Sequence, residues 1–171
     1  NCEGESTLLD VSANVSTENT VMFEVFPLYP LGFFNHPPAN PYPSGIEVNS
    51  VAPTIITDPL AQIESICINM LTDWNADMAF ILRAPSGELL ELSTNNGGGL
   101  DNYINTCFTP DATTSITAGT PPFTGDFQPE GNWNSLVGAN ILGEWQLLVS
   151  DQFGINDVGE LVSWSISFNS V

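Results

Sequence analysis

The sequence predicts an all-β protein, a jelly-roll-like β-sandwich of about eight or more antiparallel strands. Three observations favour this class. Short segments alternate apolar with polar residues, clusters of Gly, Pro and Asn separate them, and no segment has the apolar spacing of a long helix. The chain has 171 residues, of which 42% are hydrophobic, so it is long enough to bury a core.

The strand signals are clearest after residue 60. The turn at 84–87 (Ala-Pro-Ser-Gly) precedes 88–92, which is expected to be the return arm of a hairpin, and 95–99 (Asn-Asn-Gly-Gly-Gly) reads as another turn. Alternation of side chains with a period of two predicts strands that have one buried face. The segments that alternate in this way are 66–70, 78–82, 145–149 and 162–168.

Residues 1–44 have a different composition. A strand is expected at 21–26, and six prolines follow within 27–43, with aromatic residues among them. Proline cannot donate to a sheet ladder, so this stretch cannot be a central strand. We expect residues 1–44 to form an N-terminal arm whose Pro- and aromatic-rich loop packs on a sandwich made by residues 45–171.

The charge balance excludes several classes of protein. The chain has 20 acidic residues against one Lys or Arg, Arg83, and a formal net charge of −19. Nucleic-acid binding and electrostatic docking on anionic lipid both need Lys and Arg, so neither is expected. No apolar run approaches the ~20 residues needed to span a bilayer. Bound divalent cations could offset the repulsion among the acids, which is compatible with a calcium-rich or saline extracellular setting.

The chain contains three cysteines, Cys2, Cys67 and Cys107. One must remain outside any pairing within the chain. A Cys67–Cys107 disulfide is compatible with a secreted protein and lies in the better-patterned part, but free thiols at both positions are an equal alternative.

The second half of the chain carries an ordered set of motifs. Residues 143–151 read Gly-x-Trp-x-Leu-x-Val-x-Asp, and 159–168 read Gly-x-Leu-x-x-Trp-x-Ile-x-Phe. With the turn at 84–87 they resemble the P-domain (P/Homo B domain) of proprotein convertases, most closely the version found in bacterial secreted subtilisin-like proteases and cell-surface proteins. The resemblance covers roughly residues 45–171, with Ala76-Asp77-Met78 in place of the family's Gly-Asp-Leu.

The resemblance implies a function without catalysis. It implies a calcium-binding accessory module of a larger secreted protein, extracellular or at the cell surface and bacterial in origin. Its partner would be a neighbouring domain of the same polypeptide, a subtilisin-like protease domain that the module stabilises or docks. An extracellular adhesion module that binds a glycan or a protein ligand is the alternative.

Acidic loops provide the candidate calcium ligands. Calcium prefers six to eight oxygen ligands, and loops rich in Asp, Asn and Gly supply them. Asp151 and Asp157 stand at the two ends of a short loop, so they approach each other if the hairpin closes. Residues 73–77 (Asp-Trp-Asn-Ala-Asp) place oxygens at alternate positions; equally, each acid could be only a turn or cap residue. The candidate Ca²⁺ ligands are Asp73, Asp77, Asp101, Asp126, Asp151 and Asp157, with Asp111 near them in sequence.

The sequence does not favour an enzyme. His36 is the only histidine, it lies in the Pro-rich stretch, and no Gly-x-Ser-x-Gly motif occurs. Among the tryptophans, Trp145 and Trp164 fall on apolar strand faces and are expected in the core. Trp74 and Trp133 fall in polar loops, where they could either anchor the loops or stack on sugars.

Overall fold

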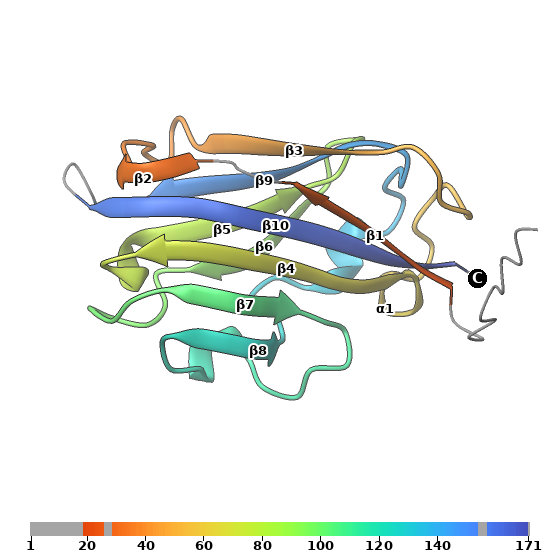
Figure 1. Cartoon of the computed structure of the whole chain (residues 1–171). Coiled ribbons are helices and arrows are strands. Elements are labelled where there is room, and N and C mark those ends of the chain that lie inside the picture. The colour runs from red at the N-terminus through yellow and green to blue at the C-terminus, as the bar shows by residue number, and fades with distance from the viewer. Residues whose placement is uncertain (1–18, 26–28, 154–156, 171) are drawn as a thin grey trace, which may run out of the picture.

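The computed structural model of the chain describes residues 19–25, 29–153 and 157–170. These residues form two packed sheets (Figure 1). Within this described part, four short helical segments connect strands: α1 (Pro59–Gln62), η1 (Asn75–Asp77), η2 (Ile116–Ala118) and η3 (Trp133–Leu136). The strands of the described residues are β1 (Asn19–Val25), β2 (Tyr29–Phe33), β3 (Tyr42–Val48), β4 (Ile63–Thr72), β5 (Met78–Arg83), β6 (Leu89–Thr94), β7 (Tyr103–Phe108), β8 (Phe123–Phe127), β9 (Gly143–Asp151) and β10 (Val158–Ser170).

The larger sheet has the order β1-β10-β4-β7-β8, and β2 also pairs with β10. The smaller sheet has the order β3-β9-β5-β6. This arrangement confirms the predicted all-β sandwich. One pair differs from the antiparallel expectation, because β7 and β8 are parallel. The connection between them is long enough to return the chain to the same end of the sheet before β8 begins.

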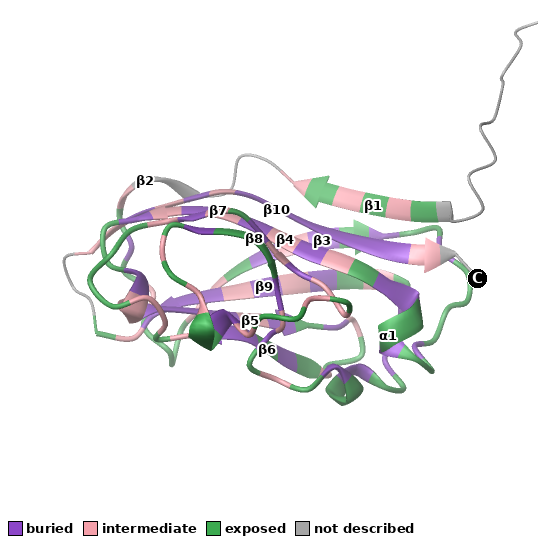
Figure 2. Cartoon of the chain, turned by 90° about the horizontal axis from the view of Figure 1, so that it is seen from below, coloured by how far each residue is buried: buried purple, intermediate pink, exposed green. Residues whose placement is uncertain are grey.

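Strand β10 organises the larger sheet. Of the apolar side chains that alternate over 162–168, Trp164, Ile166 and Phe168 are buried as predicted, whereas Val162 is half-buried. The strand is buried on both faces rather than on one, because Ser163, Ser165 and Ser167 are buried as well. It pairs with β4 on one side and with β1 and β2 on the other, so Figure 2 shows it buried along most of its length while β1 alternates between half-buried and exposed residues.

Aromatic side chains from both sheets fill the core between them. The rings of Trp145 and Phe168 lie 5.5 Å apart, and those of Phe80 and Tyr103 lie 4.8 Å apart. Each pair joins a strand of the smaller sheet to a strand of the larger one. The predicted core positions of Trp145 and Trp164 are confirmed, since both indoles are buried.

A disulfide joins Cys67 of β4 to Cys107 of β7. The two residues are direct partners in the antiparallel register, with Cα atoms 4.0 Å apart. The structure therefore decides between the two alternatives that the sequence left open for this pair. Cys2 lies outside the described residues.

The Pro-rich stretch contributes strands at the margins of both sheets. Strand β3 contains Pro43 and is an edge strand of the smaller sheet, a place where a missing backbone donor is tolerated. Phe34 is buried in the core. The division of the chain at residue 44 stays a prediction. None of the helices among the described residues has the length and hydrophobicity of a membrane-spanning segment.

Candidate metal centre

Three carboxylates meet at the end of the sandwich where β5 begins, β9 ends and β10 begins. Asp77 is the last residue of η1, Asp151 is the last residue of β9, and Asp157 directly precedes β10. Met78 opposes Asp151 in the β5–β9 register, and the backbone N–H of Gln152 donates to the carbonyl of Asp77 at 2.6 Å. The three side chains each offer a carboxylate oxygen, and these oxygens lie within 4.8 Å of one another. We call Asp77, Asp151 and Asp157 the aspartate trio.

The environment of the trio disfavours three full negative charges. Burial, a hydrogen bond with Asp77 and the charges of Asp77 and Asp73 together raise the pKa of Asp157 to about 6. Oδ2 of Asp157 is buried, and none of the described residues donates a hydrogen bond to it. Asp151 is itself a buried residue. A bound cation would supply the positive charge that this arrangement of acids needs.

Backbone hydrogen bonds position the acidic loops. The N–H of Val158 donates to Oδ1 of Asp73 at 3.0 Å, and the N–H of Phe153 donates to Oδ1 of Asp151 at 3.0 Å. The N–H of Asp73 in turn donates to the carbonyl of Val158 at 3.3 Å. Asp73 therefore lies beside the trio, with one of its oxygens already used to fix the start of β10.

The side chains at positions 73, 75 and 77, which carry oxygens at alternate positions of the sequence, lie in different surroundings. Asp77 joins the trio, whereas Asn75 is buried and its Nδ2 donates to the carbonyl of Asn102 at 3.1 Å. Oδ1 of Asn102 accepts from the N–H of Thr72 at 2.9 Å. Asn75 therefore fastens the loop after β4 to the loop before β7, a role that the spacing in sequence did not indicate.

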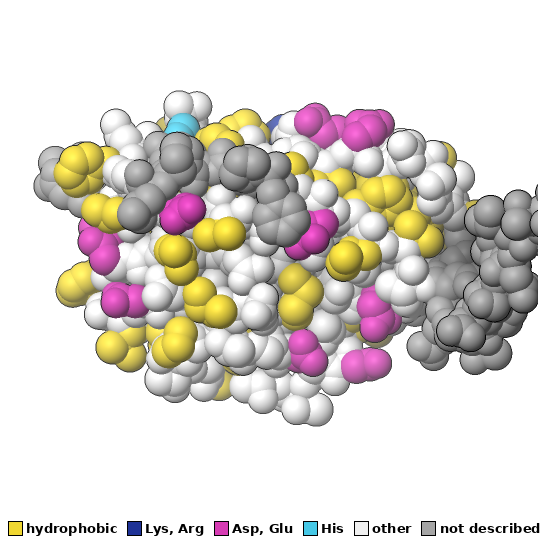
Figure 3. Space-filling model, viewed as in Figure 1, with side chains coloured by type: hydrophobic (Ala, Val, Ile, Leu, Met, Phe, Trp, Pro, Cys, Tyr) yellow, Lys and Arg dark blue, Asp and Glu magenta, His cyan; other side chains and the backbone are white. Residues whose placement is uncertain are grey.

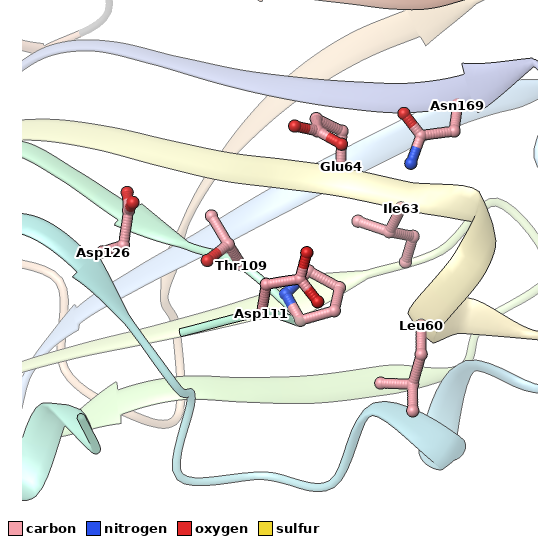
Figure 4. Close-up of a pocket in the computed structure, with 8 residues that line it drawn as sticks. Leu60, Ile63, Glu64, Thr109, Asp111, Asp126 and Asn169 are labelled. Atoms are coloured by element: carbon pink, nitrogen blue, oxygen red, sulfur yellow. The ribbon is translucent and has the colours of Figure 1, made fainter. Parts of the chain in front are cut away.

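Asp101 and Asp126 are outside the aspartate trio, and they line two different pockets. Asp101 is exposed and lines a shallow pocket of about 230 Å³ with Asp73, next to the start of β10. Asp126 lies in β8 and lines another pocket, of about 250 Å³, with Asp111 and Glu64 (Figure 4). Among the described residues, the aspartate trio is the one group of three or more acids, histidines or cysteines close enough to share an ion.

The six predicted ligands thus divide by position. Asp73, Asp77, Asp151 and Asp157 gather at one end of the sandwich with Asp101 near them, and Asp126 does not join this group. Glu64 was not singled out from the sequence. It lies in β4, and only the sheet order brings that strand near the loop that carries Asp111.

The single histidine packs among aromatic rings. The centroid of the His36 ring lies 5.2 Å from that of Phe34 and 5.3 Å from that of Tyr42. The ring of His36 is half-buried in this aromatic surrounding. Of the two loop tryptophans, Trp133 is buried and its Nε1 donates to Oε1 of Gln128 at 2.9 Å, whereas Trp74 is exposed.

Comparison with solved structures identifies the fold. The serine protease of Aeromonas sobria matches with a TM-score of 0.52 and 14% identity, over 89% of this chain and 26% of that one. The complex of the Aeromonas sobria protease with a chaperone matches with a TM-score of 0.48 and 14% identity, over 88% of this chain and 26% of that one. The chain thus spans about a quarter of the length of these proteins. No curated protein matches the sequence significantly.

Comparison with protein-family models shows the family to which the chain belongs. The family model described as the proprotein convertase P-domain matches residues 65–168, which is more than half of the chain. The matched segment runs from β4 to β10 and includes every member of the aspartate trio. The chain therefore belongs to the proprotein convertase P-domain family.

Proposed function

We propose that this protein is a calcium-stabilised, non-catalytic accessory module of a secreted subtilisin-like protease. Membership of the P-domain family supports the accessory role, since the family consists of non-catalytic modules. The size of the Aeromonas sobria protease supports the presence of a neighbouring domain, because a fold like this one accounts for only 26% of that chain.

The observation that carries the calcium proposal is the aspartate trio. Its donors are all carboxylate oxygens, a set that suits a hard cation such as Ca²⁺ better than zinc or copper. The buried Oδ2 of Asp157, which no described residue reaches with a hydrogen bond, is an acceptor that a cation would satisfy. Asp77, Asp151 and Asp157 would hold the ion, with backbone carbonyls or water completing its coordination.

Calcium at this position would stabilise the module by joining three elements. The trio connects η1, the end of β9 and the start of β10, so an ion bound there ties the smaller sheet to the larger one. Without the ion, repulsion among the carboxylates would loosen the same junction. In the extracellular medium this link would make the stability of the module depend on the concentration of free calcium.

Thermal unfolding with excess calcium and with a chelator tests the proposal. Calcium at a hundredfold its dissociation constant adds about 2.7 kcal/mol to the free energy of unfolding. For a domain of this size the melting temperature would rise by roughly 5–10 °C. Sodium chloride of matched ionic strength should not reproduce the rise.

Two matched substitutions make the assignment specific. Asp157→Asn should abolish the calcium-dependent rise, because it removes a charged ligand from the trio. Asp126→Asn, in the distant pocket of β8, should leave the rise intact. A rise that survives in Asp157→Asn, or that disappears in Asp126→Asn, would place the ion elsewhere.

A further inference from the structure

The end of the sandwich that carries the aspartate trio also carries exposed aromatic side chains. Phe153 is 77% exposed, Phe33 66%, Leu100 53% and Trp74 49%. Among the described residues, every exposed Phe or Trp side chain is in this group. Large aromatic side chains are the residues most enriched at protein–protein interfaces, and exposing several together is costly in water. We call Phe33, Trp74, Leu100 and Phe153 the aromatic end.

Backbone contacts hold the members of the aromatic end near one another. The N–H of Asn75 donates to the carbonyl of Leu100 at 3.0 Å, which sets the loop of Trp74 beside the loop of Leu100. The Trp74 ring also covers Gly99, since a Cβ there would lie 2.9 Å from the ring.

Strand β2 brings Phe33 to the same end of the sandwich. Phe33 opposes Val158 in the β2–β10 register, and the carbonyl of Val158 accepts a hydrogen bond from the N–H of Asp73.

Acidic residues lie beside the aromatic end. Asp73 and Asp101 are exposed there, and Asp151 of the aspartate trio accepts a hydrogen bond from the N–H of Phe153. Figure 3 shows hydrophobic and acidic side chains interspersed at its left-hand end, where β4 ends and β10 begins in Figure 1. Arg83 lies at the far end of β5, about 20 Å along the strand from Asp77 at the usual rise per residue.

The negative charge around the aromatic end restricts which class of partner could bind there. A second copy of the chain would bring another net charge of −19, and so would be repelled. An anionic membrane would be repelled for the same reason. A protein surface with apolar side chains flanked by Lys or Arg would cover the aromatic rings and satisfy the acidic rim together.

We infer that the aromatic end docks a partner polypeptide surface that presents apolar side chains beside Lys or Arg. The inference rests on the proposed accessory function and names the face that meets the neighbouring domain. Trp74 and Phe153 are the apolar anchors, and Asp73 and Asp101 attract the basic rim. Calcium at the trio holds the loops that carry these anchors in one arrangement.

The exposed indole of Trp74 provides the assay. Because Trp133, Trp145 and Trp164 are buried, acrylamide should quench mainly the fluorescence of Trp74. The probes are two short amphipathic peptides without tryptophan, one with Leu and Lys and one with Leu and Glu in the same pattern. In calcium-containing buffer the Leu/Lys peptide should protect Trp74 from acrylamide and the Leu/Glu peptide should not.

Matched double variants separate docking at this face from nonspecific attraction to an acidic protein. Leu100→Ser with Phe153→Ser should weaken binding of the Leu/Lys peptide about tenfold. Leu89→Ser with Leu142→Ser removes exposed side chains elsewhere on the sandwich and should change it less than twofold. Equal losses in the two variants, or equal binding of the two peptides, would overturn the inference.

Two further measurements distinguish this inference from other outcomes. Protection of Trp74 by phosphatidylcholine vesicles, with none by the Leu/Lys peptide, would replace the protein partner by a membrane surface. The calcium-dependent melting shift should persist in the Leu100→Ser, Phe153→Ser variant. If that shift is present and the Leu/Lys peptide does not bind the unmodified chain, the docking face is wrong and the calcium module stands.

Discussion

The indole Nε1 of Trp164 donates a hydrogen bond to Oγ of Ser44 at 2.9 Å, buried between the two sheets. Trp164 belongs to β10 of the larger sheet, and Ser44 belongs to β3 of the smaller one. The two residues are 120 positions apart in the sequence. This bond therefore joins the last strand of the sandwich to the edge strand formed by the Pro-rich segment.

Substitution of Ser44 tests the importance of that bond. Ser44→Ala should lower the free energy of unfolding by about 1–3 kcal/mol, because the indole N–H of Trp164 would remain buried without an acceptor. Chemical denaturation provides the measurement. Ser50→Ala, at an exposed position after β3, should change stability by less than about 0.5 kcal/mol. A loss at Ser44 no larger than at Ser50 would contradict the prediction.

The Cys67–Cys107 disulfide should contribute substantially to stability. It links residues 40 positions apart, and closing a loop of that length in the unfolded chain corresponds to about 3–4 kcal/mol. Urea unfolding with and without a phosphine reductant measures the effect. A Cys67→Ser, Cys107→Ser variant should unfold at the lower denaturant concentration in both conditions. A reductant effect that persists in this variant would have another source.

The raised pKa of Asp157 should make the proposed calcium binding depend on pH. Its pKa is raised to about 6 by burial and by the nearby carboxylates of Asp77 and Asp73, so a cation must displace a proton below that pH. The calcium-dependent melting shift should therefore be large at a pH of about 7.5 and small at a pH of about 5. A shift that is equal at the two pH values would contradict the assignment of Asp157 as a ligand.

Without calcium, the raised pKa of Asp157 predicts the opposite trend: the stability of the chain should fall as the pH rises. The pKa of Asp157 is higher in the folded chain than its ordinary value of 3.8, so folding favours the protonated form. The stability that this proton contributes is complete below a pH of about 4 and is lost as the pH rises through about 6. In chelator, Asp157→Asn should flatten that decline. The measurement is the melting temperature of both chains across this pH range.

Two glycines with similar backbone angles should differ in their tolerance of alanine. Gly97 has φ +92°, and a Cβ there would lie 2.5 Å from Cγ of Pro121 and 3.0 Å from Cε2 of Phe123. Gly125 has φ +95° and open space around the same position. Gly125→Ala should cost about 1–2 kcal/mol from backbone strain alone. Gly97→Ala should cost about 1–3 kcal/mol more, because it also overpacks the core. Equal losses in chemical denaturation would contradict this distinction.

Local patterns were sufficient to predict most of the strands. The alternation of 162–168 places apolar side chains on one face whichever neighbours the strand acquires, and β10 buries Trp164, Ile166 and Phe168 of that set. The strands β7 and β8 lack such a strict alternation. Their parallel pairing depends on the path of the intervening loop, which packs through η2 rather than following a short turn.

The candidate site was predictable only in part. Asp151 and Asp157 are separated by a short loop, and the sequence predicted that a hairpin would bring them together. They do meet, but the hairpin is wrong, because β9 and β10 lie in different sheets and the loop connects the two sheets. Asp77 joins them only because β5 pairs with β9, with Met78 opposite Asp151. The placement of Asp126 far from this group also depended on sheet order, since it lies in β8 at the edge of the larger sheet.

The fold class, the strongly acidic composition and the family resemblance follow from the amino-acid sequence, because each depends on residue types and short-range spacing. Tertiary structure decided which acids meet, that Cys67 faces Cys107, and that Trp74 is exposed while Trp133 is buried. These outcomes depend on strand order and register. In a sandwich, side chains far apart in the sequence become neighbours only when both sheets have formed, and the spacing of residues along the chain carries no record of that pairing.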